Sequence, residues 1–133
     1  MKLSRGIFAI LYGVFIVYYT ILCREPGTEL IFKPLFWELS RGAWRDIGLN
    51  ILLFVPFGLL LGDRRGILIG FLFSTSIEII QLFFRLGFCE MDDVMNNTIG
   101  TAVGVLLFIT SQKLVATMKS RYLRTGERSK SIL

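Results

Sequence analysis

Acidic and amide side chains interrupt the apolar segments of this 133-residue chain, at spacings that place them together on helix faces. An ionisable or amide group inside a segment that spans a membrane is costly, so each such residue marks a candidate site. Carboxylates can serve there as general acids or bases, and amides can hold a ligand by hydrogen bonds. Inside the segments lie Asn50, Glu78 and Gln81 with the hydroxyl group of Ser74, and just outside them lie Asp46, Asp92, Asp93 and Asn97 with the guanidinium of Arg85.

Glu78 and Asp93 are the candidate catalytic pair, because two carboxyl groups in different environments can act as acid and base. The other candidates are expected to bind a ligand. The alternative interpretation is structural, since such side chains also hold helices together in lipid at about 1 kcal/mol per hydrogen bond. The expected ligand-binding residues are Asp46, Asn50, Gln81, Arg85, Asp92 and Asn97.

Four long apolar segments must position these side chains. Each is about as long as a helix that crosses the hydrocarbon core of a bilayer, where helices are stable because they satisfy their own backbone hydrogen bonds. Hydrophobic residues make up 53% of the chain and its mean hydropathy is +0.63, which excludes a disordered chain and disfavours a water-soluble domain. The segments are 6–23, 47–62, 67–84 and 98–118.

The sequence therefore predicts an all-α integral membrane bundle of four transmembrane helices over residues 1–118, with a disordered basic tail over 119–133. Ten Lys and Arg residues flank the spans on the side of the termini, and five flank them on the other side. Since basic residues favour the cytoplasmic side, we expect a multi-pass membrane protein with both termini on the cytoplasmic side. The net charge of +5 thus reflects how the chain is oriented in the membrane, and no nucleic-acid partner is expected.

Two features near the first span leave alternatives open. The span could be a signal peptide, but residues 20–23 lack the small residues of a cleavage site. In segment 35–46, Trp37 and Trp44 suit an amphipathic helix lying in the outer interface. The same tryptophans would equally suit a loop in which they anchor the second span.

The remaining composition bears on cross-links, metals and packing. With no histidine and two cysteines, the chain offers neither a zinc cluster nor a disulfide scaffold, although Cys23 and Cys89 share the outer side and could pair. Oxygen ligands could hold Mg²⁺ or Ca²⁺, but nothing in the sequence requires a metal, and no cofactor is expected. Glycine pairs four residues apart predict close helix packing within the chain: Gly58/Gly62, Gly66/Gly70 and Gly100/Gly104.

Two motifs within residues 44–108 carry a family resemblance. The first is Asp46-x3-Asn50-x3-Phe54-x-Pro56-x-Gly58. The second is Glu78-x2-Gln81, then Cys89-Glu90-x-Asp92-Asp93-x3-Asn97-Thr98-x-Gly100-x3-Gly104. Together they resemble the VanZ-like family, small membrane proteins named for a teicoplanin-resistance protein. Members often carry an arginine just before the Cys-Glu segment, whereas here Arg85 stands further back, before Leu86-Gly87-Phe88.

The resemblance implies a cell-envelope protein of the bacterial cytoplasmic membrane that is linked to resistance against teicoplanin, a lipoglycopeptide antibiotic that acts outside the membrane. The first hypothesis is an outward polar site that engages membrane lipid headgroups, lipid-linked cell-wall precursors or the lipoglycopeptide. The second is an intramembrane enzyme acting on a lipid-linked envelope substrate, with Glu78 and Asp93 as acid and base. The third is a small proton-coupled transporter, because a buried carboxylate can relay protons, although four spans without an inverted repeat disfavour it.

Overall fold

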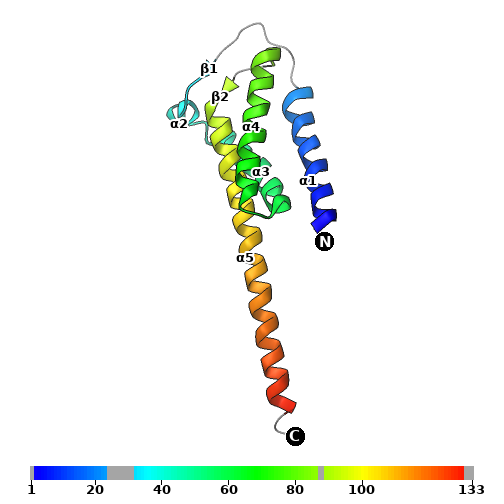
Figure 1. Cartoon of the computed structure of the whole chain (residues 1–133). Helices are drawn as coiled ribbons and strands as arrows, with labels where there is room; N and C mark the ends of the chain where they lie inside the picture. The colour runs from blue at the N-terminus through cyan, green and yellow to red at the C-terminus, as the bar shows by residue number, and fades with distance from the viewer. Residues whose placement is uncertain (1, 24–31, 87–88, 131–133) are drawn as a thin grey trace.

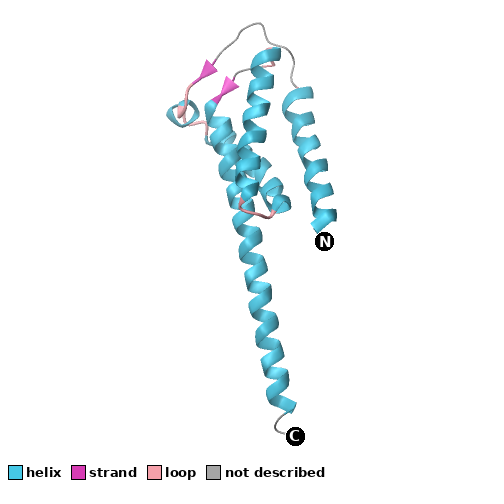
Figure 2. Cartoon of the chain, in the orientation of Figure 1, coloured by secondary structure: helices cyan, strands magenta, loops and turns pink. Residues whose placement is uncertain are grey.

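The structure, a computed structural model, describes residues 2–23, 32–86 and 89–130, which are largely helical (Figure 2). Four helical segments are long and apolar enough to cross a membrane, which confirms the predicted all-α bundle. The elements in chain order are α1 (Lys2–Val17), the π-helix η1 (Tyr18–Leu22), β1 (Phe32–Lys33), α2 (Trp37–Ser40), α3 (Trp44–Leu61), α4 (Arg65–Phe84), β2 (Cys89–Glu90) and α5 (Met91–Lys130).

Helices α3 and α5 pack with their backbones in direct contact. A Cβ atom added at Gly100 would overlap the carbonyl group of Ile51, and one added at Gly104 would lie 2.7 Å from the backbone nitrogen of Leu59. Gly58 of α3 lies against the α5 backbone in the same way. Glycine allows helices to approach this closely, so these residues serve packing within the chain, as the sequence predicts.

Helix α1 lies on the flank of the bundle, and it is joined to α3 by a hydrogen bond (Figure 1). The hydroxyl group of Tyr12 donates to the backbone carbonyl of Leu53 over 3.0 Å, three residues before Pro56 inside α3. Between α1, α3 and α4 lies the apolar core, with Phe57 and Phe73 in ring contact at its side. The buried core residues are Ile16, Phe54, Phe57 and Ile77.

At one end of the bundle, hereafter the strand end, two short strands join segments that are far apart in the sequence (Figure 1). Strands β1 and β2 pair in parallel, with Phe32 opposite Cys89 and Lys33 opposite Glu90. The interfacial helix considered for residues 35–46 is reduced to the single turn α2, and α3 already begins at Trp44. The Trp44 side chain is exposed in the first turn of this span, in agreement with the anchor interpretation.

The C-terminal segment differs from its prediction. Residues 119–130 continue α5 as a helix to Lys130, where the sequence suggested a disordered tail from residue 119 (Figure 1). Lys, Arg, Leu and Glu are good helix formers, and no proline interrupts the segment, so a helix that begins in the membrane extends into it. Charge alone does not prevent such helix propagation.

Candidate functional site

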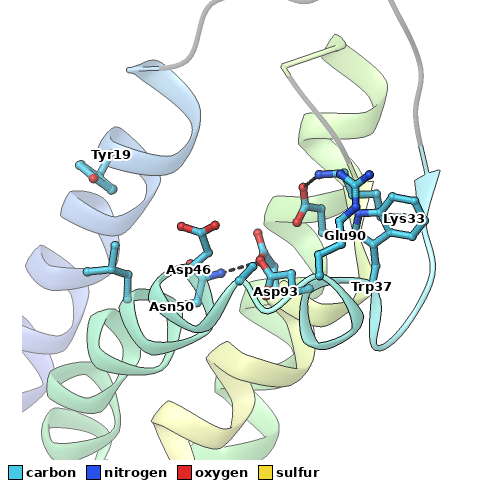
Figure 3. A pocket seen from close by; sticks show the side chains of 11 residues that line it. Tyr19, Lys33, Trp37, Asp46, Asn50, Glu90 and Asp93 are labelled. Atoms are coloured by element: carbon cyan, nitrogen blue, oxygen red, sulfur yellow. Dashed lines mark hydrogen bonds and ion pairs between the residues drawn. The ribbon is translucent and has the colours of Figure 1, made fainter.

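A pocket of about 450 Å³ lies at the strand end, between η1, α2, α3 and the start of α5 (Figure 3). Polar and charged groups dominate its wall, although it caps an apolar bundle. Aromatic and apolar side chains, including Tyr19, Trp37 and Leu49, complete the lining. Its charged lining residues are Lys33, Glu38, Arg41, Asp46, Glu90 and Asp93.

Asp92 fixes the backbone that leads into α2. Its Oδ1 accepts the N–H of Phe36 over 2.5 Å, and its Oδ2 accepts the N–H of Glu38 over 2.8 Å. Phe36 has a left-handed backbone with φ of 67°, which costs about 1–2 kcal/mol for a residue with a side chain. Asn96, one turn further along α5, donates to Oε2 of Glu38 over 3.0 Å. Asp92 and Asn96 therefore position α2, and with it one wall of the pocket.

Glu38 is almost fully buried beneath this contact, with 7% of its surface exposed. Burial raises the pKa of its carboxyl group, and the carboxylates of Glu90, Asp92 and Asp46 raise that pKa further. The ammonium group of Lys33 opposes them by lowering it. Three neighbouring carboxylates thus act on Glu38 against the single ammonium group of Lys33, so this side of the pocket carries an excess of negative charge.

The paired strands bring a cation and further carboxylates together. Lys33 of β1 forms an ion pair with Glu90 of β2, with 2.5 Å between Nζ and Oε1. The backbone N–H of Glu90 donates to Oε2 of Glu78 over 3.0 Å. Glu78 is buried in α4 and does not line the pocket, so its carboxylate holds β2 in place from behind.

Asp93 and Asp46 approach the pocket from α5 and α3. The side-chain amide of Asn50 donates to Oδ1 of Asp93 over 2.5 Å, which links the two helices beneath the pocket (Figure 3). Asp46 lies one turn before Asn50, and its carboxylate projects into the cavity (Figure 3). Within the described residues, no donor or cation pairs with the Asp46 carboxylate.

Three carboxylates of the pocket could together hold a divalent cation. Oxygen atoms of Glu38, Glu90 and Asp93 lie within 4.8 Å of one another. Each already has a partner: Asn96 donates to the first, Lys33 pairs with the second and Asn50 donates to the third. Each of the three carboxylates is therefore held by one hydrogen bond or ion pair within the protein.

The other predicted site residues lie between helices rather than on the pocket. Gln81 donates to the backbone carbonyl of Thr20 over 2.9 Å, and Asn97 donates to Oγ of Ser74 over 2.8 Å. Their side-chain oxygens are buried and accept no hydrogen bond within the described part of the chain. Arg85 is exposed at the left-handed C-cap of α4 and does not line the pocket.

Of the residues predicted from the sequence, Asp46, Asn50 and Asp93 line the pocket, together with residues of the first connecting segment that were not predicted. Lys33, Glu38 and Arg41 precede the family-like motifs and show no helical periodicity with them. Glu90 belongs to the second motif, and its negative charge can be neutralised by a cation such as Lys33. This was the one signal in the sequence that could have indicated a pocket residue in the connecting segment. The two cysteines are free thiols, exposed at Cys23 and buried at Cys89, so the structure lends the predicted disulfide no support.

Comparison with known proteins agrees with the motifs. The VanZ/LLP1 family matches residues 8–114 of the chain. Protein VanZ of Enterococcus faecium is similar, with 32% identity over 124 residues that cover 84% of this chain and 76% of that relative. No solved structure matches.

Proposed function

Because the chain belongs to the VanZ/LLP1 family, we propose that it lowers the susceptibility of a bacterial cell to teicoplanin-type lipoglycopeptides by engaging lipid headgroups or envelope glycolipids. The observation that carries the proposal is the polar pocket of about 450 Å³ at the strand end of a membrane-spanning bundle. A cavity with converging polar groups is the usual form of a small-ligand site. Its position at the end of the spans is the level at which headgroups lie.

The proposal requires the strand end to face outward. The opposite end carries the N-terminus, the turn between α3 and α4, and the basic residues of the C-terminal half of α5 (Figure 1). Basic segments favour the cytoplasmic side, and this distribution supports a pocket on the outer surface of the cytoplasmic membrane. Arg5 supports this placement, since its guanidinium lies 4.2 Å from the centre of the Phe108 ring at that opposite end.

Thiol labelling tests the orientation. Cys23 is exposed at the strand end, directly after η1, whereas Cys89 is buried. We expect a membrane-impermeant maleimide to label the wild-type protein on intact cells, and Cys23→Ser to remove most of that label. Labelling that requires permeabilised cells would place the strand end in the cytoplasm and contradict the proposal.

Asp93 provides the functional test, because Asp93→Asn preserves an acceptor for Asn50 while removing the charge. In a teicoplanin-susceptible host, at equal membrane levels, we expect the protection by this variant to be about tenfold lower than the protection by the wild-type protein. A tenfold loss corresponds to about 1.4 kcal/mol of binding free energy. The measurement is the minimal inhibitory concentration of teicoplanin. Asp63→Asn is the matched control, since Asp63 is exposed in the turn between α3 and α4.

Two outcomes would overturn the proposal. Full protection by Asp93→Asn would show that the pocket is not required for protection against teicoplanin. The wild-type protein could also give no protection although it reaches the membrane at the level of a protective relative. This outcome would show that the chain does not lower susceptibility to teicoplanin.

A further inference from the structure

The polar pocket continues into an apolar groove on the bundle's flank. This groove has a volume of about 390 Å³ and lies between α1 and α3. Tyr19, Leu49 and Asn50 line both the pocket and the groove, so the two cavities meet at these residues. Below them the groove wall is apolar, with Leu52 and Pro56 on α3.

Along α3, the pocket and the groove together span about the length of one bilayer leaflet. From Asp46 to Pro56, α3 rises about 15 Å, at about 1.5 Å per residue. This is about half of a hydrocarbon core of roughly 30 Å. The Tyr12 hydroxyl, which binds the α3 backbone at Leu53, joins α1 to α3 near the inner end of the groove. An acyl chain lying in the groove would therefore run beside the chains of the surrounding leaflet.

The charges of the pocket decide which headgroup suits it. Four carboxylates face two cations, Lys33 and Arg41, so the pocket has an excess of negative charge. The Lys33 ammonium is already paired with Glu90, and the Arg41 guanidinium lies 4.9 Å from the centre of the Trp37 ring. The Asp46 carboxylate, which pairs with no group in the described part of the chain, stands one helical turn above Leu49 and Asn50, where the groove begins.

We infer that the pocket and groove together bind a membrane lipid whose headgroup carries a primary ammonium, with the ammonium at Asp46 and one acyl chain in the groove. A primary ammonium offers N–H donors to a carboxylate. A quaternary ammonium would need open aromatic faces, and Arg41 already occupies a position over Trp37. This inference rests on the proposed function and names the class of its ligand.

Lipid retention by the purified full-length protein tests the headgroup. Two probes with identical acyl chains, phosphatidylethanolamine and phosphatidylglycerol, are added to the protein in detergent, and bound lipid is measured by native mass spectrometry. We expect about tenfold preference for phosphatidylethanolamine, since charge-assisted hydrogen bonds are the stronger class. Asp46→Asn should abolish that preference while leaving the fold intact, because Asp46 makes no other pairing within the described residues.

The groove is tested by a variant that fills it. Leu52 is 65% exposed and lines only the groove, so Leu52→Trp should weaken retention of both lipids equally and keep their ratio. Leu68→Trp, at a similarly exposed position of α4 outside the pocket and groove, is the control. Equal retention of the two lipids by the wild-type protein would overturn the inference, as would displacement of phosphatidylethanolamine by free ethanolamine at equal concentration.

The binding assay is independent of the antibiotic assay. If the wild-type protein protects against teicoplanin but shows no headgroup preference, this inference is wrong and the proposed function stands. If it prefers phosphatidylethanolamine but gives no protection, the proposed function is wrong and the ligand assignment is retained.

Discussion

Gly104→Ala is expected to lower the melting temperature of the protein by about 10 °C, which corresponds to about 3 kcal/mol of unfolding free energy. The added methyl group would overlap the carbonyl oxygen of Val55 and lie 2.7 Å from the backbone nitrogen of Leu59. Over-packing costs about 1–3 kcal/mol even where side chains can rearrange. Here the obstacle is the backbone of α3, so the two helices must separate along their shared face.

Gly48→Ala is the matched control for this prediction. Gly48 also lies in α3, but an added Cβ atom there would meet nothing within 4 Å. Alanine forms helices better than glycine, so this variant should keep or slightly raise the melting temperature. Thermal unfolding of both variants in the same detergent makes the comparison. Equal melting temperatures for Gly104→Ala and the wild-type protein would show that α3 and α5 do not depend on this close approach.

The sequence predicted the bundle because a bilayer imposes simple requirements on a chain. Spanning helices need long apolar segments, and close backbone contact needs small residues, so both features can be recognised without a structure. The predicted position of Asp46, Asn50 and Asp93 at one end of the bundle follows from the same requirements. Helix periodicity then fixes which residues share a face, as it did for Ser74, Glu78 and Gln81.

Periodicity does not determine which neighbour a helix face meets. The buried stripe of α4 meets η1, β2 and α5, where Gln81 binds the Thr20 carbonyl and Glu78 binds the Glu90 amide. These residues therefore position other elements, and the pocket lies elsewhere. Most of the missed pocket residues belong to a connecting segment whose shape depends on contacts from distant α5 residues. Because two-residue strands and a one-turn helix carry no sequence pattern, Lys33 and Glu38 could not be assigned in advance.

Asp92→Asn is expected to release the segment that forms α2 while the transmembrane helices stay folded. The variant replaces one acceptor oxygen by an amide that faces a backbone N–H, so at least one of the two hydrogen bonds to Phe36 and Glu38 is lost. A hydrogen bond to a charged group contributes about 1.5–3 kcal/mol to stability. Without the bond to Asp92, nothing offsets the strain of the left-handed backbone at Phe36. We expect amide hydrogen exchange of residues 35–40 to accelerate about a hundredfold.

The expected pattern separates this effect from general destabilisation. Exchange in α3 and α4 should be unchanged, and lipid preference should fall with Asp92→Asn as it does with Asp46→Asn, because the pocket wall at α2 is lost. Phe36→Gly, which relieves the backbone strain, should restore part of the protection against hydrogen exchange in the Asp92→Asn background. Asp63→Asn is the control, since its carboxylate is exposed and accepts only a 3.4 Å contact from the Arg65 amide. Unchanged exchange over residues 35–40 in Asp92→Asn would show that other contacts hold α2, and Asp92 would lose its positioning role.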